Sequence, residues 1–204
     1  MNFDIPDVKA LADAFDPEEP TGDLFLDGLY TRCARPYYRL FYRLAERYRP
    51  RMVAELGAWQ GTAAAHWAPH SGTVATMDHH TDPGDDENER LCREAARRYA
   101  NLFYFKGWTW DVVGDVRDLG KYIRVLFMDS WHHYDKMMRD WQEYEPLLDP
   151  DGALVIVDDV HDMETTMVGM ERFWEEVSEG RDRFLTEQVS EYPMGFFRWE
   201  DWRR

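Results

Sequence analysis

The sequence predicts an α/β fold, a doubly wound, seven-stranded and mostly parallel sheet that ends in a C-terminal antiparallel hairpin. Short apolar runs alternate with longer segments of helical spacing, which is typical of parallel strands joined by crossover helices. Acidic residues follow three of these runs, and ligands bind at the carboxyl ends of strands in open sheets. After Gly180 two apolar runs lie too close together for a crossover helix, so they predict a hairpin.

The composition fits a folded protein rather than a disordered one. Of the 204 residues, 44% are hydrophobic and 15% aromatic, which is enough for a packed core. The net charge of −16 repels phosphate backbones and anionic membranes, so we expect neither nucleic acid nor a membrane as a partner. We see no signal peptide and no apolar run of about 20 residues, and we therefore expect a cytoplasmic protein.

The chain divides into an N-terminal arm or lid, residues 1–34, and a main domain, residues 35–204. The arm is acidic and interrupted by prolines, so we expect a loose segment with short helical pieces. Its aromatic side chains suit a lid over the site or a contact with another subunit, and these are Phe25, Tyr30 and the neighbouring Tyr37.

The elements of the main domain follow from its apolar pattern. Five parallel strands are predicted at Met52–Leu56, Thr73–Met77, Leu102–Phe105, Val125–Met128 and Ala153–Val157. Helices are predicted at Pro36–Pro50, Thr62–Trp67, Leu91–Tyr99, Met137–Leu148 and Met167–Val177. The hairpin strands are predicted at Phe184–Val189 and Gly195–Trp199, with a turn at Tyr192 and Pro193.

A glycine loop follows the first predicted strand and opens a short helix. Gly57 allows a tight turn, and Gly61 allows the backbone to approach a ligand beside a helix N-terminus. The loop matches neither the dinucleotide fingerprint nor the P-loop, and Glu55 beside it suits a cationic cofactor better than a pyrophosphate. We count Trp59, inside the loop, among the cofactor-binding candidates. A strand-to-helix turn without a ligand is the alternative.

The next two strand ends fit an adenosyl ligand. Asp78 lies about 20 residues after the glycines, where an acid accepts hydrogen bonds from ribose hydroxyls. Gly107 and Trp108 follow the third strand, where the indole suits stacking on an adenine as well as it suits plain packing. We interpret His79 and His80 as part of an exposed loop beside the cofactor rather than as zinc ligands.

Over residues 35–199 the chain resembles the class I S-adenosylmethionine-dependent methyltransferases, which commonly read Glu-x-Gly-x-x-x-Gly at this loop. The resemblance implies a Rossmann-like methyltransferase fold with S-adenosylmethionine as the cofactor. It also implies that Glu55, Gly57 and Gly61 hold the methionine part of the cofactor and that Asp78 holds the ribose.

An acidic cluster is predicted where the fourth and fifth strands end. Asp129 follows one strand, and Asp158 and Asp159 follow its parallel neighbour, which brings three carboxylates together. They would repel one another and raise one another's pKa unless a cation lay among them, and oxygen ligation suits Mg²⁺ or another divalent cation. Asp129 is also a candidate cofactor contact. The alternative is that one aspartate caps a helix while another pairs with a basic side chain.

This part of the chain is similar to the metal-dependent O-methyltransferases that include macrocin O-methyltransferases and cephalosporin hydroxylase-like proteins. The similarity lies in Asp129-x-x-His132 and in the later acidic pair. It implies that Asp129, Asp158 and Asp159 are metal ligands and that His132 is the catalytic base. Relatives often carry glycine and a second acid between the Asp and the His, where this chain has serine and tryptophan, and that difference bears on the substrate pocket.

These patterns predict an S-adenosylmethionine-dependent O-methyltransferase that uses a divalent cation to activate a hydroxyl of a small molecule. The acceptor would be a sugar, a diol or a catechol-like phenol, as in natural product biosynthesis. A bound cation lowers the pKa of such a hydroxyl, and a nearby imidazole accepts its proton. The alternatives are a metal-independent N- or carboxyl-methyltransferase of the same fold and a non-catalytic adenosyl-ligand-binding protein. The sequence leaves open whether the chain forms a homo-oligomer.

Overall fold

The structure is a computed structural model, which describes residues 3–32, 35–81, 84–163, 166–187, 190 and 192–200. Its strands are β1 (Val53–Leu56), β2 (Val74–Asp78), β3 (Leu102–Lys106), β4 (Val125–Met128), β5 (Ala153–Val157), β6 (Arg183–Thr186) and β7 (Met194–Trp199). Its helices are α1 (Ile5–Asp13), α2 (Leu24–Arg32), α3 (Tyr37–Tyr48), α4 (Thr62–Trp67), α5 (Asp85–Arg98), α6 (Val113–Asp118), α7 (Tyr134–Tyr144) and α8 (Met170–Ser178). Short 3₁₀ turns, Ala68–His70 and Glu145–Leu147, follow α4 and α7.

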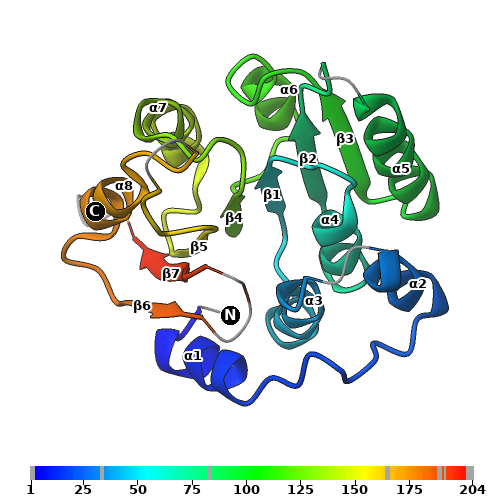
Figure 1. Cartoon of the computed structure of the whole chain (residues 1–204), viewed down its shortest axis with the longest axis horizontal. Helices are drawn as coiled ribbons and strands as arrows, with labels where there is room; N and C mark the ends of the chain where they lie inside the picture. The colour runs from blue at the N-terminus through cyan, green and yellow to red at the C-terminus, as the bar shows by residue number, and fades with distance from the viewer. Residues whose placement is uncertain are drawn as a thin grey trace.

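The seven strands form one sheet in the order β3-β2-β1-β4-β5-β7-β6 (Figure 1). Strands β1 to β5 pair in parallel, whereas β7 runs antiparallel between β5 and β6. The predicted fold class, a Rossmann-like sheet with an antiparallel hairpin, is therefore confirmed. The winding reverses between β1 and β4, and open α/β sheets bind ligands at such a switch point.

The strand boundaries agree closely with the prediction. Each of the five parallel strands and β7 begins and ends within one residue of its predicted position. The first hairpin strand was predicted as Phe184–Val189 but ends at Thr186, and Val189 lies outside the described residues. In the parallel strands every residue of β1, β4 and β5 is buried, because helices cover both faces of the sheet.

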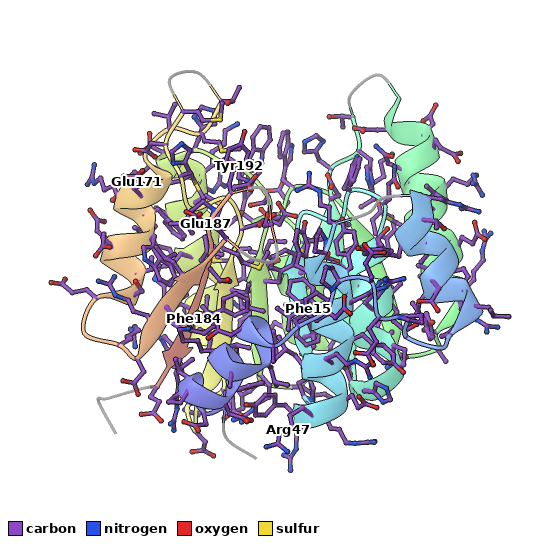
Figure 2. All side chains as sticks on the ribbon, turned by 60° about the horizontal axis from the view of Figure 1, so that its bottom comes forward. Phe15, Arg47, Glu171, Phe184, Glu187 and Tyr192 are labelled. Carbon is purple, nitrogen blue, oxygen red and sulfur yellow. The ribbon has the colours of Figure 1, made fainter. Side chains whose placement is uncertain are left out.

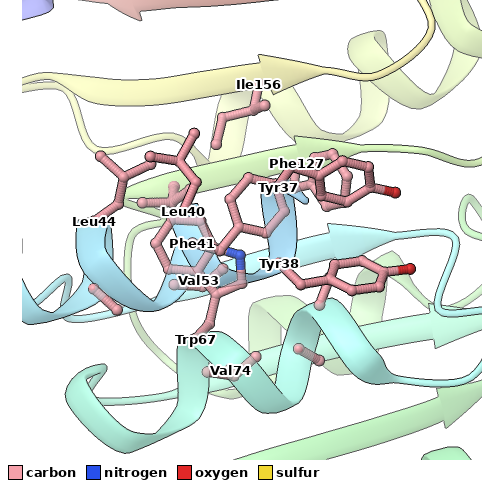
Figure 3. Packing of buried hydrophobic residues seen from close by; sticks show 14 of the residues in the cluster. Tyr37, Tyr38, Leu40, Phe41, Leu44, Val53, Trp67, Val74, Phe127 and Ile156 are labelled. Carbon is pink, nitrogen blue, oxygen red and sulfur yellow. The ribbon is translucent and has the colours of Figure 1, made fainter. Parts of the chain in front are cut away.

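Two apolar cores, one on each face of the sheet, hold the layers together. The first is formed by side chains of α1 to α5, and Phe41 on α3 lies at its centre. The Phe41 ring lies 4.9 Å from the Trp67 ring and 4.8 Å from the Phe127 ring, measured between centroids (Figure 3). The second core is formed by α6, α7 and α8 with the opposite faces of the same strands, and it includes Tyr144 and Trp174.

The N-terminal segment is packed more closely than the loose arm that we expected. Ile5, Val8 and Ala12 of α1 are buried, and so are side chains of α2. Helix α1 contacts α3, β6 and β7, in the region where Figure 2 labels Phe15 and Phe184. The prolines of this segment predict a loop. Proline is also tolerated in the first turn of a helix, however, and α1 has one there. The division at residue 34 stays a prediction.

The three aromatic residues expected in a lid or a subunit contact pack within the described chain, and that expected role stays a prediction. The Phe25 ring packs edge-on against Tyr99 at 6.1 Å, and the Arg39 guanidinium lies 3.8 Å above the Tyr30 ring. Tyr37 is buried within α3. Among the described helices, none is long and apolar enough to cross a membrane.

Candidate functional site

A cavity of about 350 Å³ opens at the carboxyl ends of β1 to β4. Five of the predicted cofactor residues line it, namely Gly57, Trp59, Asp78, Trp108 and Asp129. They follow or end four different strands, so the parallel topology brings together side chains that are far apart in the sequence. The cavity therefore occupies the ligand crevice that the strand order defines.

The glycine loop is fixed by close backbone contacts. Gly57 has a φ of 94°, and a Cβ atom there would collide with the backbone of Asp129 and Ser130 after β4. Gly61 has a φ of 70°, and its Cβ would lie 3.1 Å from the Cα of Cys92 on α5. Gly57 thus permits the contact with the neighbouring strand end, whereas Gly61 approaches a helix rather than the cavity.

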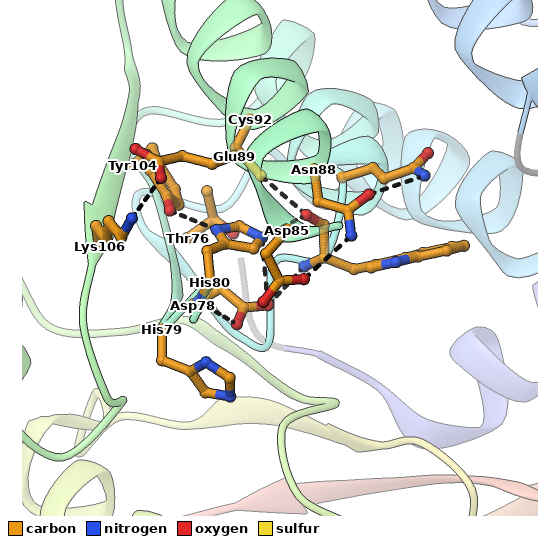
Figure 4. Close-up of polar contacts among 12 residues, drawn as sticks. Thr76, Asp78, His79, His80, Asp85, Asn88, Glu89, Cys92, Tyr104 and Lys106 are labelled. Carbon is orange, nitrogen blue, oxygen red and sulfur yellow. Dashed lines mark hydrogen bonds and ion pairs between the residues drawn. The ribbon is translucent and has the colours of Figure 1, made fainter. Parts of the chain in front are cut away.

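Trp59 has a left-handed backbone that its neighbours hold in place. Its φ is 43°, a conformation that costs a non-glycine residue on the order of 1 kcal/mol. Its N–H donates to Asp78 Oδ2 at 2.8 Å, and its carbonyl oxygen lies 2.7 Å from His80 Nε2 (Figure 4). His80 is buried and also contacts the Tyr104 hydroxyl at 2.6 Å, so our expectation of an exposed loop is wrong at His80. Asp78 therefore supports the glycine loop as well as facing the cavity.

Glu55 lies beneath the loop rather than in the cavity wall. Its carboxylate accepts a hydrogen bond from the Thr76 hydroxyl at 2.6 Å, and the side chain is buried. Burial raises the pKa of Glu55 well above its ordinary value, and the charges of Asp129 and Asp78 add to this effect. Its predicted contact with the methionine part of the cofactor stays a prediction.

Two carboxylates of the predicted acidic cluster, those of Asp129 and Asp159, lie beside His132. Its Nε2 lies 3.5 Å from Asp129 Oδ1 and 3.3 Å from Asp159 Oδ2. Burial alone would lower the pKa of His132, but the hydrogen bond and the negative charges of Asp129 and Asp159 raise it above its ordinary value. Asp158 is fully buried, and burial together with the two neighbouring carboxylates raises its pKa well above its ordinary value.

The residues of this cluster fit a divalent cation in their chemistry. Neither oxygen of Asp158 has a hydrogen-bond partner among the described residues, and a buried carboxylate without one is costly. Asp129 and Asp159 add hard oxygen donors of the kind that Mg²⁺ and Ca²⁺ prefer. In the side-chain positions of the described chain, however, no group of three or more such ligands is arranged to hold a metal ion. The carboxylates that could bind a cation are present, and their side chains would have to rotate to bring the oxygen atoms together around it.

Arg35 is a member of this site that our sequence analysis did not identify. It lies just before α3, lines the cavity, and places Nη1 3.9 Å from Asp158 Oδ2. Its guanidinium carbon also lies 5.8 Å from the centre of the Trp59 ring. A basic partner for one aspartate is the alternative to a metal, and no pattern along the chain indicates that this partner comes from so distant a segment.

An aromatic wall closes one side of the cavity. Trp108 stacks on Trp131 at 5.4 Å and on Trp110 at 5.3 Å, and His79 lies 4.2 Å from Trp108 between ring centres. Lys136 Nζ lies 3.2 Å from the centre of the Trp131 ring. Trp108 therefore packs against other rings and also lines the cavity, and its stacking on an adenine stays a prediction.

Several predicted residues of the described chain do not line the cavity. These are Glu55, Gly61, Gly107, His132, Asp158 and Asp159. The lining contains residues that the prediction missed, namely Arg35, Tyr38, Met77, Thr109, Ser130 and Trp131, and it includes His79, which was expected beside the cofactor. Thr109 and Ser130 directly follow Trp108 and Asp129, which were predicted to contact the cofactor. Their position in the sequence could therefore have identified them as cavity residues.

The strand order is that of the Rossmann-like methyltransferase fold, and the cavity lies at its switch point. The chain belongs to a family described as a methyltransferase domain, whose sequence model matches residues 54–160. That match extends from β1 to the residues after β5, and so it includes the glycine loop and the acidic cluster. A search of curated proteins finds no significant match.

Solved structures share the fold at low sequence identity. The O-methyltransferase TomG from Streptomyces achromogenes, involved in tomaymycin synthesis and in complex with SAM, is 16% identical with a TM-score of 0.64, covering 95% of this chain and 94% of its own. The O-methyltransferase from Bacillus cereus in complex with SAH is 16% identical with a TM-score of 0.62, covering 95% and 88%. Cofactor-bound Rv0187 from MTB is 18% identical with a TM-score of 0.64, covering 95% and 87%.

Proposed function

We propose that this protein transfers a methyl group from S-adenosylmethionine to a hydroxyl of a small molecule with the help of a divalent cation. The observation that carries the proposal is the cavity at the switch point, where Gly57, Asp78 and Trp108 lie next to Asp129 of the acidic cluster. The Streptomyces and Bacillus O-methyltransferases hold SAM and SAH, which supports the same class of cofactor for this fold.

The residues of the cavity suit an adenosyl ligand. Asp78 uses Oδ2 to hold the loop, and its carboxylate retains lone pairs that would accept hydrogen bonds from ribose hydroxyls. The Trp108 and Trp131 rings offer an apolar wall for a flat base. The carboxylate of Asp129, which lines the cavity, would favour a positively charged sulfonium over a neutral ligand.

The acidic cluster suits activation of a hydroxyl. A sulfonium cofactor supplies an electrophilic methyl group, and a divalent cation lowers the pKa of a hydroxyl that it coordinates. Asp129, Asp158 and Asp159 would hold that cation. His132 in its neutral form would accept the hydroxyl proton, and the carboxylates of Asp129 and Asp159 beside its Nε2 would stabilise the resulting imidazolium.

The acceptor that we infer is a small polar molecule, either a sugar, a diol or a catechol-like phenol. The net charge of −16 disfavours a nucleic acid as the acceptor and supports a small molecule instead. A place in natural product biosynthesis is part of the same proposal.

A metal-independent transferase of this fold is the second candidate, and Arg35 favours it. The guanidinium lies 3.9 Å from Asp158 and already supplies positive charge to the cluster. In this alternative Asp158 and Asp159 would be structural, and methyl transfer would not respond to a chelator.

Calorimetric titration separates these possibilities. S-adenosylhomocysteine and MgCl₂ would be titrated separately into the wild type, an Asp158→Asn/Asp159→Asn variant, and a control, Glu18→Gln/Glu19→Gln, which changes two exposed acids. We expect all three proteins to bind S-adenosylhomocysteine, and only the wild type and the control to bind Mg²⁺. Cofactor binding without any Mg²⁺ site would favour the metal-independent candidate, and no cofactor binding by the wild type would overturn the proposal.

A further inference from the structure

A buried carboxylate lies behind the wall of the cavity, and the proposed mechanism does not use it. Asp140 is on α7 and is fully buried. Its Oδ1 accepts a hydrogen bond from the Thr109 hydroxyl, and its Oδ2 accepts one from the Ser130 hydroxyl at 2.6 Å. Thr109 follows β3, Ser130 follows β4, and both line the cavity. A single side chain therefore joins two loops of the cavity wall.

The same face of α7 makes further contacts with these loops. Met137, Asp140 and Tyr144 are its buried residues, and their spacing places them on one side of the helix. The Tyr144 hydroxyl donates to the Thr109 carbonyl oxygen at 2.8 Å, and the Ser130 hydroxyl lies 3.6 Å from Met137 Sδ. Three residues along one face of α7 thus contact the loops that carry Thr109 and Ser130.

A carboxylate is an expensive choice for packing alone. An apolar side chain of similar size would fill the same space without a desolvation cost, and such replacements are often neutral or stabilising in proteins. Burial raises the pKa of Asp140 to about 6, although the hydrogen bonds from Ser130 and Thr109 oppose this shift. What the carboxylate adds is two acceptors in fixed directions, and hydrogen bonds to an ionised acceptor are stronger than neutral ones.

We propose that Asp140 is a positioning residue for the cofactor pocket. By holding Thr109 and Ser130, it fixes the adjacent Trp108 and Trp131, whose ring centres lie 5.4 Å apart, in the arrangement that an adenosyl ligand meets. This inference rests on the proposed binding of an adenosyl cofactor. Asp140 does not line the cavity, so we expect its effect to appear in cofactor affinity through the residues that it holds.

The test compares two variants of Asp140 with a matched control. Asp140→Ala removes both acceptors, whereas Asp140→Asn keeps the shape and one carbonyl oxygen. The control is Ser178→Ala on α8, which removes a buried hydroxyl that donates to the Trp174 carbonyl oxygen at 2.6 Å, away from the cavity lining. We expect Asp140→Ala to raise the Kd for S-adenosylhomocysteine about tenfold or more, as expected from the loss of one or more hydrogen bonds. Asp140→Asn should recover most of that affinity, and Ser178→Ala should lower Tm without changing Kd.

A second readout needs no ligand. The stacked Trp108 and Trp131 rings contribute to the near-ultraviolet circular dichroism, and a Trp108→Phe variant identifies their part of the spectrum. That part should be lost in Asp140→Ala and kept in Ser178→Ala. A wild-type Kd together with a wild-type spectrum in Asp140→Ala would overturn the positioning role and leave the cofactor proposal standing. A wild type that does not bind S-adenosylhomocysteine would overturn both.

Discussion

Arg35 carries positive charge into the most acidic part of the site. Burial alone would lower its pKa, but Tyr37, Asp129 and Asp158 raise it, so the guanidinium stays charged. The same guanidinium lowers the pKa of Asp158, which burial and the other carboxylates raise. A divalent cation and Arg35 would therefore compete for one set of carboxylates.

This competition predicts the effect of removing the charge. We expect Arg35→Gln to bind Mg²⁺ roughly tenfold more tightly than the wild type, because a positive charge near the cation site is lost. The measurement is calorimetric titration with MgCl₂ at constant ionic strength. The control is Arg43→Gln, which removes an arginine of α3 that pairs with Glu19 and Glu46. Unchanged or weaker binding in Arg35→Gln would show that Arg35 does not compete with the cation.

Asp140 predicts a pH-dependent term in the free energy of unfolding. Its folded pKa of about 6 lies above its ordinary value of 3.8, so the folded state binds the proton more tightly. The stabilisation of the folded state by protonation of Asp140 is therefore fully present below about pH 4 and is lost as the pH rises through 6. Urea unfolding of the wild type and of Asp140→Asn between pH 4 and pH 7.5 measures it. The stability of the wild type relative to Asp140→Asn should fall with rising pH by about 3 kcal/mol. A difference independent of pH would contradict the raised pKa.

For single helices and strands, the accuracy with which the sequence predicts the boundaries depends on how much of the element is buried. Strands β1, β4 and β5 are buried along their whole length, so each appears as an unbroken apolar run. Of the four residues of the edge strand β6, Thr186 alone is buried, and the predicted end of this strand is less accurate. Helix α6 has six residues with Val116 as its buried one, which is too few to produce a helical period, and we did not predict it.

The contact between the glycine loop and β4 predicts opposite effects for two glycine substitutions. Gly57→Ala should be strongly destabilising and should abolish cofactor binding, because the added Cβ collides with the backbone of Asp129. Gly28→Ala, in α2, meets no atom of the described chain within 4 Å and should stabilise by about 0.4–1 kcal/mol. Thermal unfolding and S-adenosylhomocysteine titration of both variants check this. Equal effects would mean that the close approach at Gly57 is not required.

The packing between α3 and the sheet predicts where stability resides. Phe41→Ala should lower the free energy of unfolding by about 3–5 kcal/mol, because it opens a cavity between Trp67 and Phe127. The control, Tyr122→Ala, changes a side chain that is 55% exposed and should stay within about 0.5 kcal/mol of the wild type. Urea unfolding measures both. A loss below about 1 kcal/mol for Phe41→Ala would contradict the central place of this ring in the core.

For the whole molecule, the topology was more predictable than the completed site. The parallel order of the strands explains why Gly57, Asp78 and Asp129 could be predicted together, since each lies at a strand end. Arg35 could not be predicted, because the segment before α3 reaches the site only through tertiary packing. The stack of Trp108 on Trp131 likewise depends on side-chain orientation, which spacing along the chain does not specify.

Because the two cores lie on opposite faces of the sheet, binding of a ligand in the cavity can be detected from the stability of the protein. Arg35 and Tyr38 reach the cavity from the side of α3, and Thr109 and Ser130 are held from the side of α7. A molecule bound in the cavity would contact both layers and so bind only when both are folded. By mass action, each tenfold excess of ligand over its Kd would add about 1.4 kcal/mol to the stability of the domain. A rise in melting temperature would therefore report cofactor, cation and acceptor alike, before any reaction is assayed.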